Sequence, residues 1–437
     1  MTLTRPRIAA AAIITMSIIA LSACSGGDDA ASESPRFEPP EELAEPGNEI
    51  PDVTIKTGFS PYADELLAVA GLERGYFDDV GISVDPAPYG AEVDRIAAVT
   101  PLLTQQIQIG SGYTPAVAPQ LDNVDDVVTF AIQDVFYGYR ILAPEGKYTT
   151  VAELMDEGAD YEDAVTEVMA QLEGQDVILR DGIVPTFYNL ITATAGGSMA
   201  DWNVSYLPNP DIVRAAQSGQ ADFVSPSGAM EISRLQMDGW EPIIELRQVI
   251  DNMPSDETIS LRSTFSGYLT TRQQAEEDWE TLLRFTSVIY RLIDDLEGDP
   301  VGTSADFVDY VNSYTGSSLT AEELASTFDG LYSVRSFEDA ADFFVDEDSP
   351  FYFPEVAGAQ IDELADQGVI GEGHGPSDLS IAGEVYDALV RYRAEADKLL
   401  GDLPDGELAD RARAQYDARN YLDAYRLAAV AAEESGS

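Results

Sequence analysis

Apolar and polar positions alternate in blocks that predict strands and helices in regular succession along the chain. The expected elements are, in order, a strand over 53–57, a helix over 66–75, a strand over 82–84, a helix over about 92–104, a strand over 107–110 and a loop over 111–115. Strands and helices in alternation are typical of a mostly parallel sheet with helices on its faces.

The same order returns farther along the chain. The expected elements are a strand over 175–180, a helix over 186–195 opened by Pro185, a strand over 203–207, a helix over 210–218 and a strand over 221–224. Two such units predict two α/β lobes. Residues 139–143 and 267–271 are extended segments suited to crossing from one lobe to the other.

Three further stretches have helical spacing: 151–173, which we assign to the second lobe as an insert, 275–296, and the region beyond Pro376. The last of these predicts two helices, over about 379–400 and 406–434, joined by a turn. Tyr416 and Tyr421 recur there at helical spacing. An aromatic stripe of this kind is usually core, so a helical hairpin packed on a lobe is favoured over a docking module.

The N-terminal residues have the pattern of an export signal. Arg5 and Arg7 precede an apolar run over 8–21, which at about 14 residues is too short to span a bilayer. Cys24, the single cysteine of the chain, follows directly. Residues 25–52 are rich in Gly, Ser, Pro and acidic residues and predict a disordered tether.

The charge and the residue types narrow the function classes. The formal net charge is −55, which repels nucleic-acid backbones and is typical of a solvated acidic surface. His374, the single histidine, lies in a Gly/Pro-rich loop. We therefore expect no catalytic residue, no metal site and no cofactor, although catalysis by carboxylates alone stays open.

Several stretches resemble a known family. "LSAC", ending at Cys24, resembles the lipobox of bacterial lipoproteins. "GYFDDVGI" (75–82), "LEGQDVIL" (172–179) and "IVRAAQSGQADFVSPS" (212–227) resemble the solute-binding proteins of ABC importers for nitrate, sulfonates, taurine and thiamine pyrimidines. The resemblance covers about residues 53–370, and the C-terminal helices lie outside it.

This resemblance implies an α/β, two-lobed, type II periplasmic-binding-protein fold with a C-terminal helical hairpin. The expected division is a signal peptide over 1–23, a lipid anchor and tether over 24–52, the first part of lobe 1 over 53–138, lobe 2 over 139–266, the return to lobe 1 over 267–376 and the helical extension over 377–437.

The function implied is capture of a small solute by lobe closure and its delivery to an ABC permease. The protein is expected outside the cytoplasm, as a monomer anchored to the outer face of the membrane by lipid on Cys24. Two alternatives stay open: an interaction lipoprotein that uses the C-terminal hairpin, and, less favoured, an enzyme of pyrimidine synthesis on the same fold.

Loops after parallel strands are where such a receptor places ligand groups. The expected ligand-binding residues are small hydroxyl residues, aromatics and one acid on these loops: Ser60, Tyr62, Tyr113, Thr114, Tyr137, Asp181, Thr186, Tyr188, Ser225 and Ser227. Asp181 and Glu231 suit a cationic group, and these loops hold no lysine. We expect a planar or amine-bearing organic solute, with a sulfonate-like one as the alternative.

Overall fold

The computed structural model describes residues 37–93, 98–124, 126–180 and 186–436. The predicted signal peptide and Cys24 lie outside these residues, as does Asp181. Within the described residues no helix is both long and apolar enough to cross a membrane.

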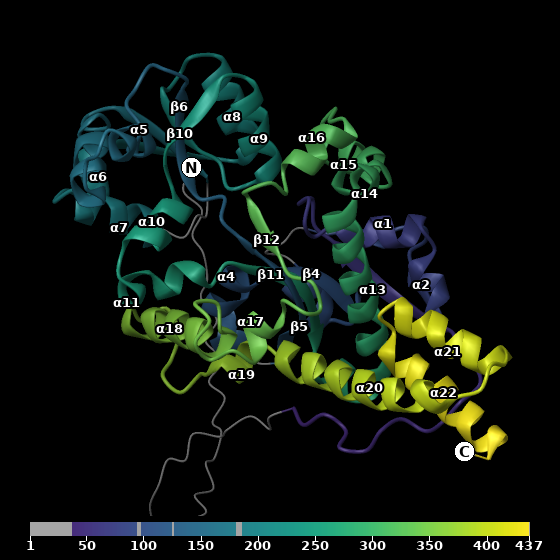
Figure 1. Ribbon diagram of the computed structural model, residues 1–437. Helices are drawn as coiled ribbons and strands as arrows, with labels where there is room; N and C mark the ends of the chain where they lie inside the picture. The colour runs from purple at the N-terminus through teal and green to yellow at the C-terminus, as the bar shows by residue number, and fades with distance from the viewer. Residues whose placement is uncertain (1–36, 94–97, 125, 181–185, 437) are drawn as a thin grey trace, which may run out of the picture. The chain divides into compact units, whose positions relative to one another are not determined.

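The first lobe is built on a seven-stranded mixed sheet in the order β12-β5-β11-β4-β1-β2, with β3 paired to β1 (Figure 1). Its strands are β1 (Val53–Phe59), β2 (Ile82–Asp85), β3 (Ala91–Glu92), β4 (Ile109–Tyr113), β5 (Val127–Phe136), β11 (Phe265–Thr271) and β12 (Tyr332–Val334). β1 pairs in parallel with β2 and β4, whereas β11 runs antiparallel between β4 and β5. As a result, the carboxyl ends of β1, β4 and β5 meet at one edge of the sheet.

The second lobe is built on a five-stranded sheet in the order β10-β6-β9-β7-β8. Its strands are β6 (Arg140–Pro144), β7 (Asp176–Arg180), β8 (Asn203–Leu207), β9 (Phe223–Ser225) and β10 (Trp240–Glu245). β7 pairs in parallel with β8 and β9, as the strand–helix order predicts, and β6 is antiparallel to β9. The two sheets confirm the predicted two-lobed α/β fold.

The helices follow the same division. Those of the second lobe are α5 (Val151–Asp156), α6 (Tyr161–Ala170), α7 (Thr186–Thr194), η2 (Met199–Asp201), α8 (Asn209–Gln217), α9 (Ala229–Met237) and α10 (Leu246–Asn252), and α11 (Ser255–Thr258) and η3 (Ile259–Arg262) lead back. Those of the first lobe are α1 (Leu67–Glu73), α2 (Tyr76–Asp79), α3 (Val99–Leu103), α4 (Thr114–Val117), η1 (Ala118–Asn123), α12 (Arg272–Glu277), α13 (Trp279–Gly298), α14 (Pro300–Ala305), α15 (Val308–Thr315), α16 (Ala321–Ser326), α17 (Ala341–Phe344), α18 (Phe353–Asp366) and α19 (Pro376–Leu379).

The chain crosses between the sheets at two places, and the two crossings are hydrogen-bonded to each other. The outward crossing follows β5 at residues 137–139, and the return crossing precedes β11 at Ser263 and Thr264. Phe136 N donates to Thr264 O (2.9 Å), and Thr264 Oγ1 donates to Phe136 O (2.7 Å). The extended segment 267–271, expected to cross, lies instead inside β11, because its backbone is fully used in pairing with β4 and β5.

Several helix boundaries differ from the prediction because single residues leave the helical region. Residues 151–173 divide at Gly158, whose φ is +100°, and residues 275–296 divide at Asp278. The C-terminal stretch 406–434 divides at Arg419, whose φ is +66°. The helix expected over 92–104 is reduced to α3 among the described residues, and Ser111 to Tyr113, expected in a loop, belong to β4.

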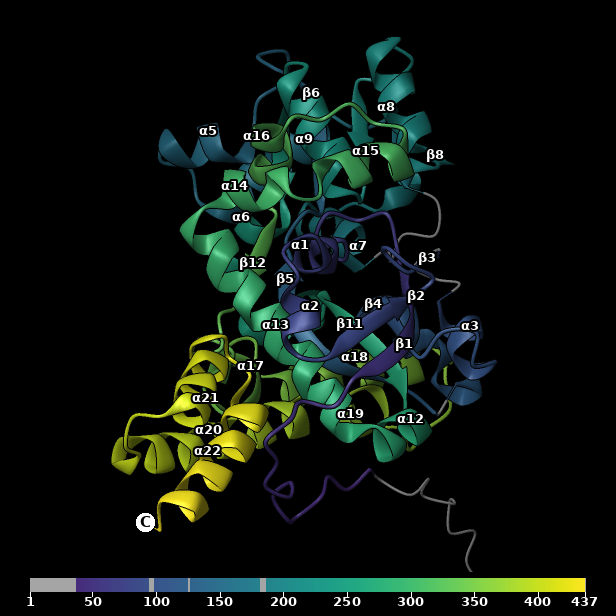
Figure 2. The ribbon, with the colours of Figure 1, turned by 90° about the vertical axis from the view of Figure 1, so that its right-hand side faces the viewer.

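The C-terminal extension therefore consists of three helices, α20 (Ala382–Asp402), α21 (Glu407–Asp417) and α22 (Tyr421–Ser435), and they pack on the first lobe. α20 lies against β5 and α13, and α22 lies against α13 (Figure 2). Tyr421 is buried between Phe337 and Tyr416, at ring-centroid distances of 5.0 and 5.2 Å. The aromatic stripe is core, as expected.

A buried ion pair fixes this extension to the lobe. Arg284 on α13 makes two hydrogen bonds to Asp423 on α22, at 2.7 and 2.9 Å, and both side chains are at most 3% exposed. Asn420 and Arg426 also donate to Asp423, at 2.8 and 3.0 Å. Because the charge is fully enclosed by donors, its desolvation is compensated.

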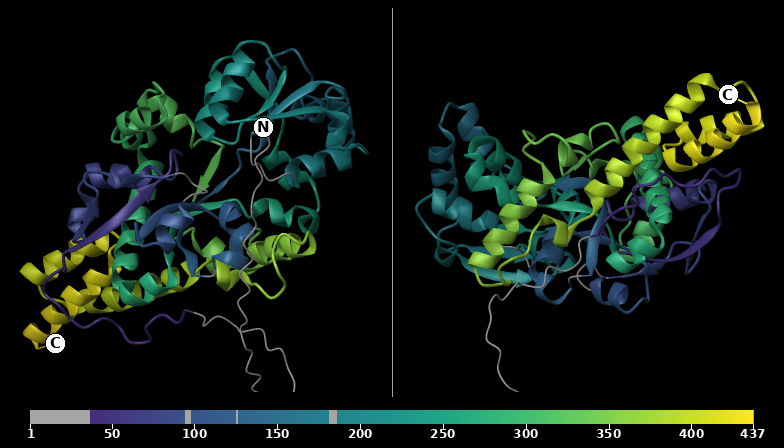
Figure 3. Two further views of the ribbon diagram at one scale, coloured as in Figure 1. Left: turned by 180° about the vertical axis from the view of Figure 1, so that it is seen from behind. Right: turned by 90° about the horizontal axis from the view of Figure 1, so that it is seen from below.

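The prediction of a disordered tether over residues 25–52 is wrong for residues 37–49. Residues 37–49 run along the C-terminal helices (Figure 3). Phe37 is 5% exposed and packs on Trp279 at 5.1 Å, and Ala44 N donates to the Tyr392 hydroxyl at 2.9 Å. Arg391 donates to the carbonyls of Pro40 and Glu41 (3.1 and 3.0 Å). The low-complexity composition did not predict this docking, because the partner residues lie more than 240 positions away in sequence.

Replacing Asp423 with Ala should lower the free energy of unfolding by about 3 kcal/mol, since it leaves the buried Arg284 guanidinium with only the partly exposed carboxylate of Glu280 (3.1 Å) as an acidic partner. Denaturant unfolding measures this loss. The matched control is Asp410→Ala, which removes an exposed pair with Arg413 (3.2 Å) and should cost less than about 1 kcal/mol. Equal losses for the two variants would contradict the role given to the buried pair.

The double variant Arg391→Ala/Tyr392→Phe should release residues 41–47 without unfolding the lobe, because it removes three hydrogen bonds to that segment. Amide hydrogen exchange of the segment should then become at least about tenfold faster. Arg393→Ala, on the same helix but paired with Glu338 (3.2 Å), should leave this exchange unchanged. Unaltered exchange in the double variant would show that other contacts hold the segment.

Candidate functional site

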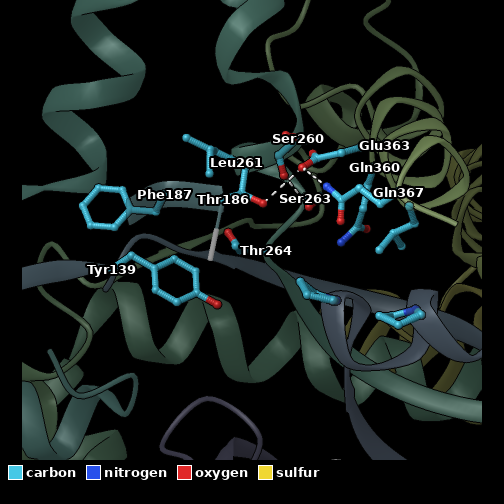
Figure 4. Close-up of a pocket in the computed structure, with 13 residues that line it drawn as sticks. Tyr139, Thr186, Phe187, Ser260, Leu261, Ser263, Thr264, Gln360, Glu363 and Gln367 are labelled. Carbon is cyan, nitrogen blue, oxygen red and sulfur yellow. Dashed lines mark hydrogen bonds between the residues drawn. The ribbon is translucent and has the colours of Figure 1, made fainter. Parts of the chain in front are cut away.

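A cavity with a volume of about 70 Å³, which opens to solvent, lies beside the two crossings and is lined from both lobes (Figure 4). The second lobe contributes the first turn of α7, and the first lobe contributes α18 and the residues after β4. The thirteen lining residues are Pro115, Pro119, Tyr139, Thr186, Phe187, Ser260, Leu261, Ser263, Thr264, Gln360, Glu363, Leu364 and Gln367.

α18 and its C-cap residue Gln367 supply three of the polar lining residues because of their helical spacing. Gln360, Glu363, Leu364 and Gln367 follow one another at intervals of three, one and three residues, which places them on one face of the helix. Gln360 is 8% exposed, and its Oε1 has no hydrogen-bond partner among the described residues. The cavity thus has an unsatisfied buried acceptor in its wall.

Glu363 joins the two lobes across the cavity. Thr186 Oγ1, at the start of α7, donates to Glu363 Oε1 at 3.2 Å, and Gln367 Nε2 donates to the same oxygen at 3.0 Å (Figure 4). The hydrogen bond from Thr186 connects the start of α7 with α18. Any change in the angle between the lobes has to stretch or break it.

The hydroxyl groups of the return crossing face the cavity, and each donates its proton to a hydrogen bond within the protein. Ser263 Oγ donates to Ser260 O at 2.6 Å, and Thr264 Oγ1 donates to Phe136 O at 2.7 Å. A hydroxyl that donates within the protein keeps its lone pairs as acceptors. These two side chains therefore present acceptors to a solute.

An apolar wall completes the cavity. The rings of Tyr139 and Phe187 are stacked, with centroids 6.3 Å apart and planes inclined by 24°. Leu261, Leu364 and two prolines lie on the same lining. An aromatic or alkyl part of a solute can be buried against this wall.

Three of the residues predicted from the sequence belong to this cavity or border it. Thr186 lines it, and Thr114, 2% exposed, directly precedes the lining residue Pro115. The hydroxyl groups of Tyr113 and Tyr139 are 2.9 Å apart, so Tyr113 holds the lining ring of Tyr139 in place.

Two further predicted residues lie at the edge where β1, β4 and β5 end. Ser60 is fully buried and its N–H donates to Ser111 Oγ at 2.8 Å, while Tyr62 is partly exposed beside it. Neither lines the cavity. The pKa of the nearby Tyr268 hydroxyl is raised well above its ordinary value by burial and by the carboxylates of Glu65, Asp64 and Asp134.

The remaining predicted residues lie in the second lobe or at the crossing and contact protein groups. Tyr188 shares a 2.6 Å hydrogen bond with Ser225, which also donates to Arg140 O, and burial raises the pKa of the tyrosine. Ser227 N donates to Asn209 Oδ1 (3.1 Å). Burial raises the pKa of Tyr137 to about 12, and this ring packs under Arg247 at 4.8 Å. Asp181 lies outside the described residues.

The sequence reasoning missed Gln360, Glu363 and Gln367. Their spacing marked one face of a helix, but nothing in the sequence indicated that this face meets α7 of the other lobe. It also missed Ser263 and Thr264, because the return crossing was placed four residues too late. The sequence does show a polar face on a helix otherwise rich in apolar residues. It does not indicate which element this face contacts.

The other candidate groups lie away from the cavity. His374 Nε2 is 2.8 Å from Asp122 Oδ1, and hydrogen bonds from the Gly371 backbone and from His374 lower the pKa of that carboxyl. Glu231 is partly buried on α9, and burial raises its pKa. Among the described residues no cluster of metal-ligating side chains is found.

Comparison with known proteins supports the fold. No protein-family model matches the chain, and no curated protein matches it in sequence. Among solved structures, a putative periplasmic sulfonate-binding protein SsuA from Methylobacillus flagellatus aligns with a TM-score of 0.53 at 12% identity, over 79% of this chain and 96% of that chain.

Two other similar structures are the aliphatic sulphonate-binding SsuA from Escherichia coli (TM-score 0.49, 17% identity, 76% of this chain and 91% of that chain) and the nitrate-binding NrtA from Synechocystis PCC 6803 (TM-score 0.48, 12% identity, 79% and 90%). At these identities a likeness establishes the fold and nothing finer. The resemblance found in the sequence is thus confirmed for the architecture: this chain has the two-lobed fold of periplasmic binding proteins.

Proposed function

We propose that this protein is an extracytoplasmic solute-binding lipoprotein that captures a small organic molecule between its lobes and delivers it to an ABC importer. The observation that carries the proposal is the cavity beside the crossings, lined by α7 of one lobe and α18 of the other. Pockets at the junction of two domains or lobes are a usual place for a small ligand.

The crossings provide the hinge that such capture requires. They are short, hydrogen-bonded to each other at Phe136 and Thr264, and adjacent to the cavity. A small rotation about them moves α7 relative to α18, while both sheets stay intact. The bond between Thr186 and Glu363 then forms or breaks as the lobes close or open.

Binding is favoured over catalysis. The similar structures named above are described as binding proteins, and the one histidine of the chain, His374, pairs with Asp122 away from the cavity lining. We also disfavour the alternative in which the C-terminal helices dock a partner protein. Tyr421 and the Arg284–Asp423 pair pack these helices on the first lobe instead.

We further propose that lipid on Cys24 anchors the protein to the outer face of the cell membrane. Since residues 37–49 are docked on the C-terminal helices, at most residues 24–36 separate the docked segment from the proposed anchor. Thirteen residues reach at most about 45 Å when extended. The docked segment thus limits how far the lobes can stand from the anchor.

Replacing Cys24 with Ser should abolish lipid attachment. In a bacterial host that processes lipoproteins, the parent chain is expected to incorporate a labelled fatty acid and to fractionate with membranes. The variant is expected to lose the label and to appear in the extracytoplasmic soluble fraction. Retention of the fatty-acid label by the variant would place the acyl group elsewhere and refute the anchor.

Filling the cavity should prevent solute capture. After incubation with growth-medium extract and desalting, native mass spectrometry of the full chain is expected to show a retained small-molecule mass. Gln367→Trp, at an exposed lining position, should lose this mass, whereas Asp366→Trp, one residue earlier and off the lining, should keep it. If the parent chain retains nothing, or Gln367→Trp retains the same mass, the proposal fails.

A further inference from the structure

We infer that the solute presents a protonated amine or guanidinium group to this cavity and is not an anion. The inference rests on the proposed function and specifies its solute class. It follows from the hydrogen-bonding capacity and the charge of the lining, which differ from what a nitrate or sulfonate group requires.

The hydroxyl groups of the lining act as acceptors toward a solute. Thr186 donates to Glu363, Ser263 donates to Ser260 O, and Thr264 donates to Phe136 O, so each of these three protons is used within the protein. What these three hydroxyl groups present to the cavity is lone pairs. An oxyanion, which has acceptors only, gains nothing from such groups, whereas an N–H donor does.

α18 adds two stronger acceptors. Both hydrogen bonds to Glu363 end on Oε1, so its Oε2 has no partner among the described residues. Gln360 is more than nine-tenths buried with an unpartnered Oε1, which costs free energy until a donor reaches it. The two residues are one helical turn apart, so one ammonium or guanidinium group can bond to both.

The charge of the lining agrees with the acceptors. Among the thirteen lining residues Glu363 is the only charged one. The arginines nearest to the lining in sequence are turned to other partners: Arg140 lies 3.3 Å from Glu245, and Arg262 donates to Ser255 and Thr258 at 3.1 and 3.2 Å. Among the described lining residues, no side chain carries a positive charge that could neutralise a sulfonate.

The start of α7 is the part of the cavity that would suit an anion, since a helix N-terminus attracts negative charge. Here the carboxylate of Glu363 lies close by, because its Oε1 accepts from the side-chain hydroxyl of Thr186, the first described residue of α7. An anionic solute would have to displace Glu363 or lie against it. A cationic solute, in contrast, meets a carboxylate already held in place.

The apolar wall defines the other half of the solute. Tyr139 and Phe187 present aromatic surface next to the acceptors, and Leu261 and Leu364 extend it. Aromatic faces also attract cations. The combination fits an organic amine with an aromatic or alkyl portion.

Aryl probes that differ only in their head group test the inference on the full chain. Benzylamine and benzamidine carry N–H cations, and benzenesulfonate carries an anion on the same ring. By ligand-observed NMR and calorimetry, the two cations should bind at least about tenfold more tightly than the sulfonate. Glu363→Gln should weaken cation binding at least about tenfold, as expected for loss of a charged hydrogen bond.

The matched control is Asp362→Asn, which removes the same charge from an exposed position on the same helix and should change cation affinity less than about twofold. If Glu363→Gln does not fold, as judged by thermal melting, Gln360→Leu provides the second test and should weaken binding of both cations severalfold. If the lining variant binds the cations with the same affinity as the parent chain, the assignment of the cation to this cavity is overturned.

The outcomes separate this inference from the proposed function. If benzenesulfonate binds as tightly as the cations, or if none of the three probes binds at millimolar concentration, the solute class is wrong. The proposal that the protein is a solute receptor is then still decided by the mass-spectrometry experiment, in which the parent chain retains a solute mass and Gln367→Trp loses it. If no solute mass is retained either, both proposals fail together.

Discussion

The structure depends on the hydrogen bonds that join the two crossings between the lobes. Phe136 and Thr264 satisfy each other's polar groups at the point where the chain leaves one sheet and returns to it. Because the N–H and C=O groups of Phe136 pair with the C=O and hydroxyl groups of Thr264, these four groups are satisfied where the chain passes between the sheets. This junction also fixes where the cavity lies, since Thr264, Ser263 and Tyr139 belong to these crossings and line it.

A second constraint is the strong negative charge of the chain. With a formal charge of −55, self-repulsion opposes compaction, and some of the arginines bind acidic or carbonyl groups of distant segments. Arg284 fixes α22 to α13 through Asp423, and Arg391 holds residues 40 and 41 on α20. The C-terminal helices thereby connect the first lobe with the segment that follows the predicted lipid anchor.

The sequence predicted the architecture well because alternation and helical spacing are local signals. Strands such as Val53–Phe59 and Asp176–Arg180 were recognised. Breaks at Asp278 and Arg419 were missed because single backbone conformations carry no periodic signal. The site was predicted only in part: Thr186 was identified from its place after a strand, whereas Glu363 acts through a contact between lobes that no local pattern encodes.

The central claim is that the lobes close on a solute at the crossings, and an interlobe distance tests it most directly. After Cys24→Ser, cysteines can be placed at the exposed positions Glu167 on α6 and Asp309 on α15 and spin-labelled. Pulsed electron resonance then gives the distance distribution with and without saturating solute. The account predicts a shorter and narrower distribution when solute is bound. An identical distribution at saturation would contradict capture by lobe closure.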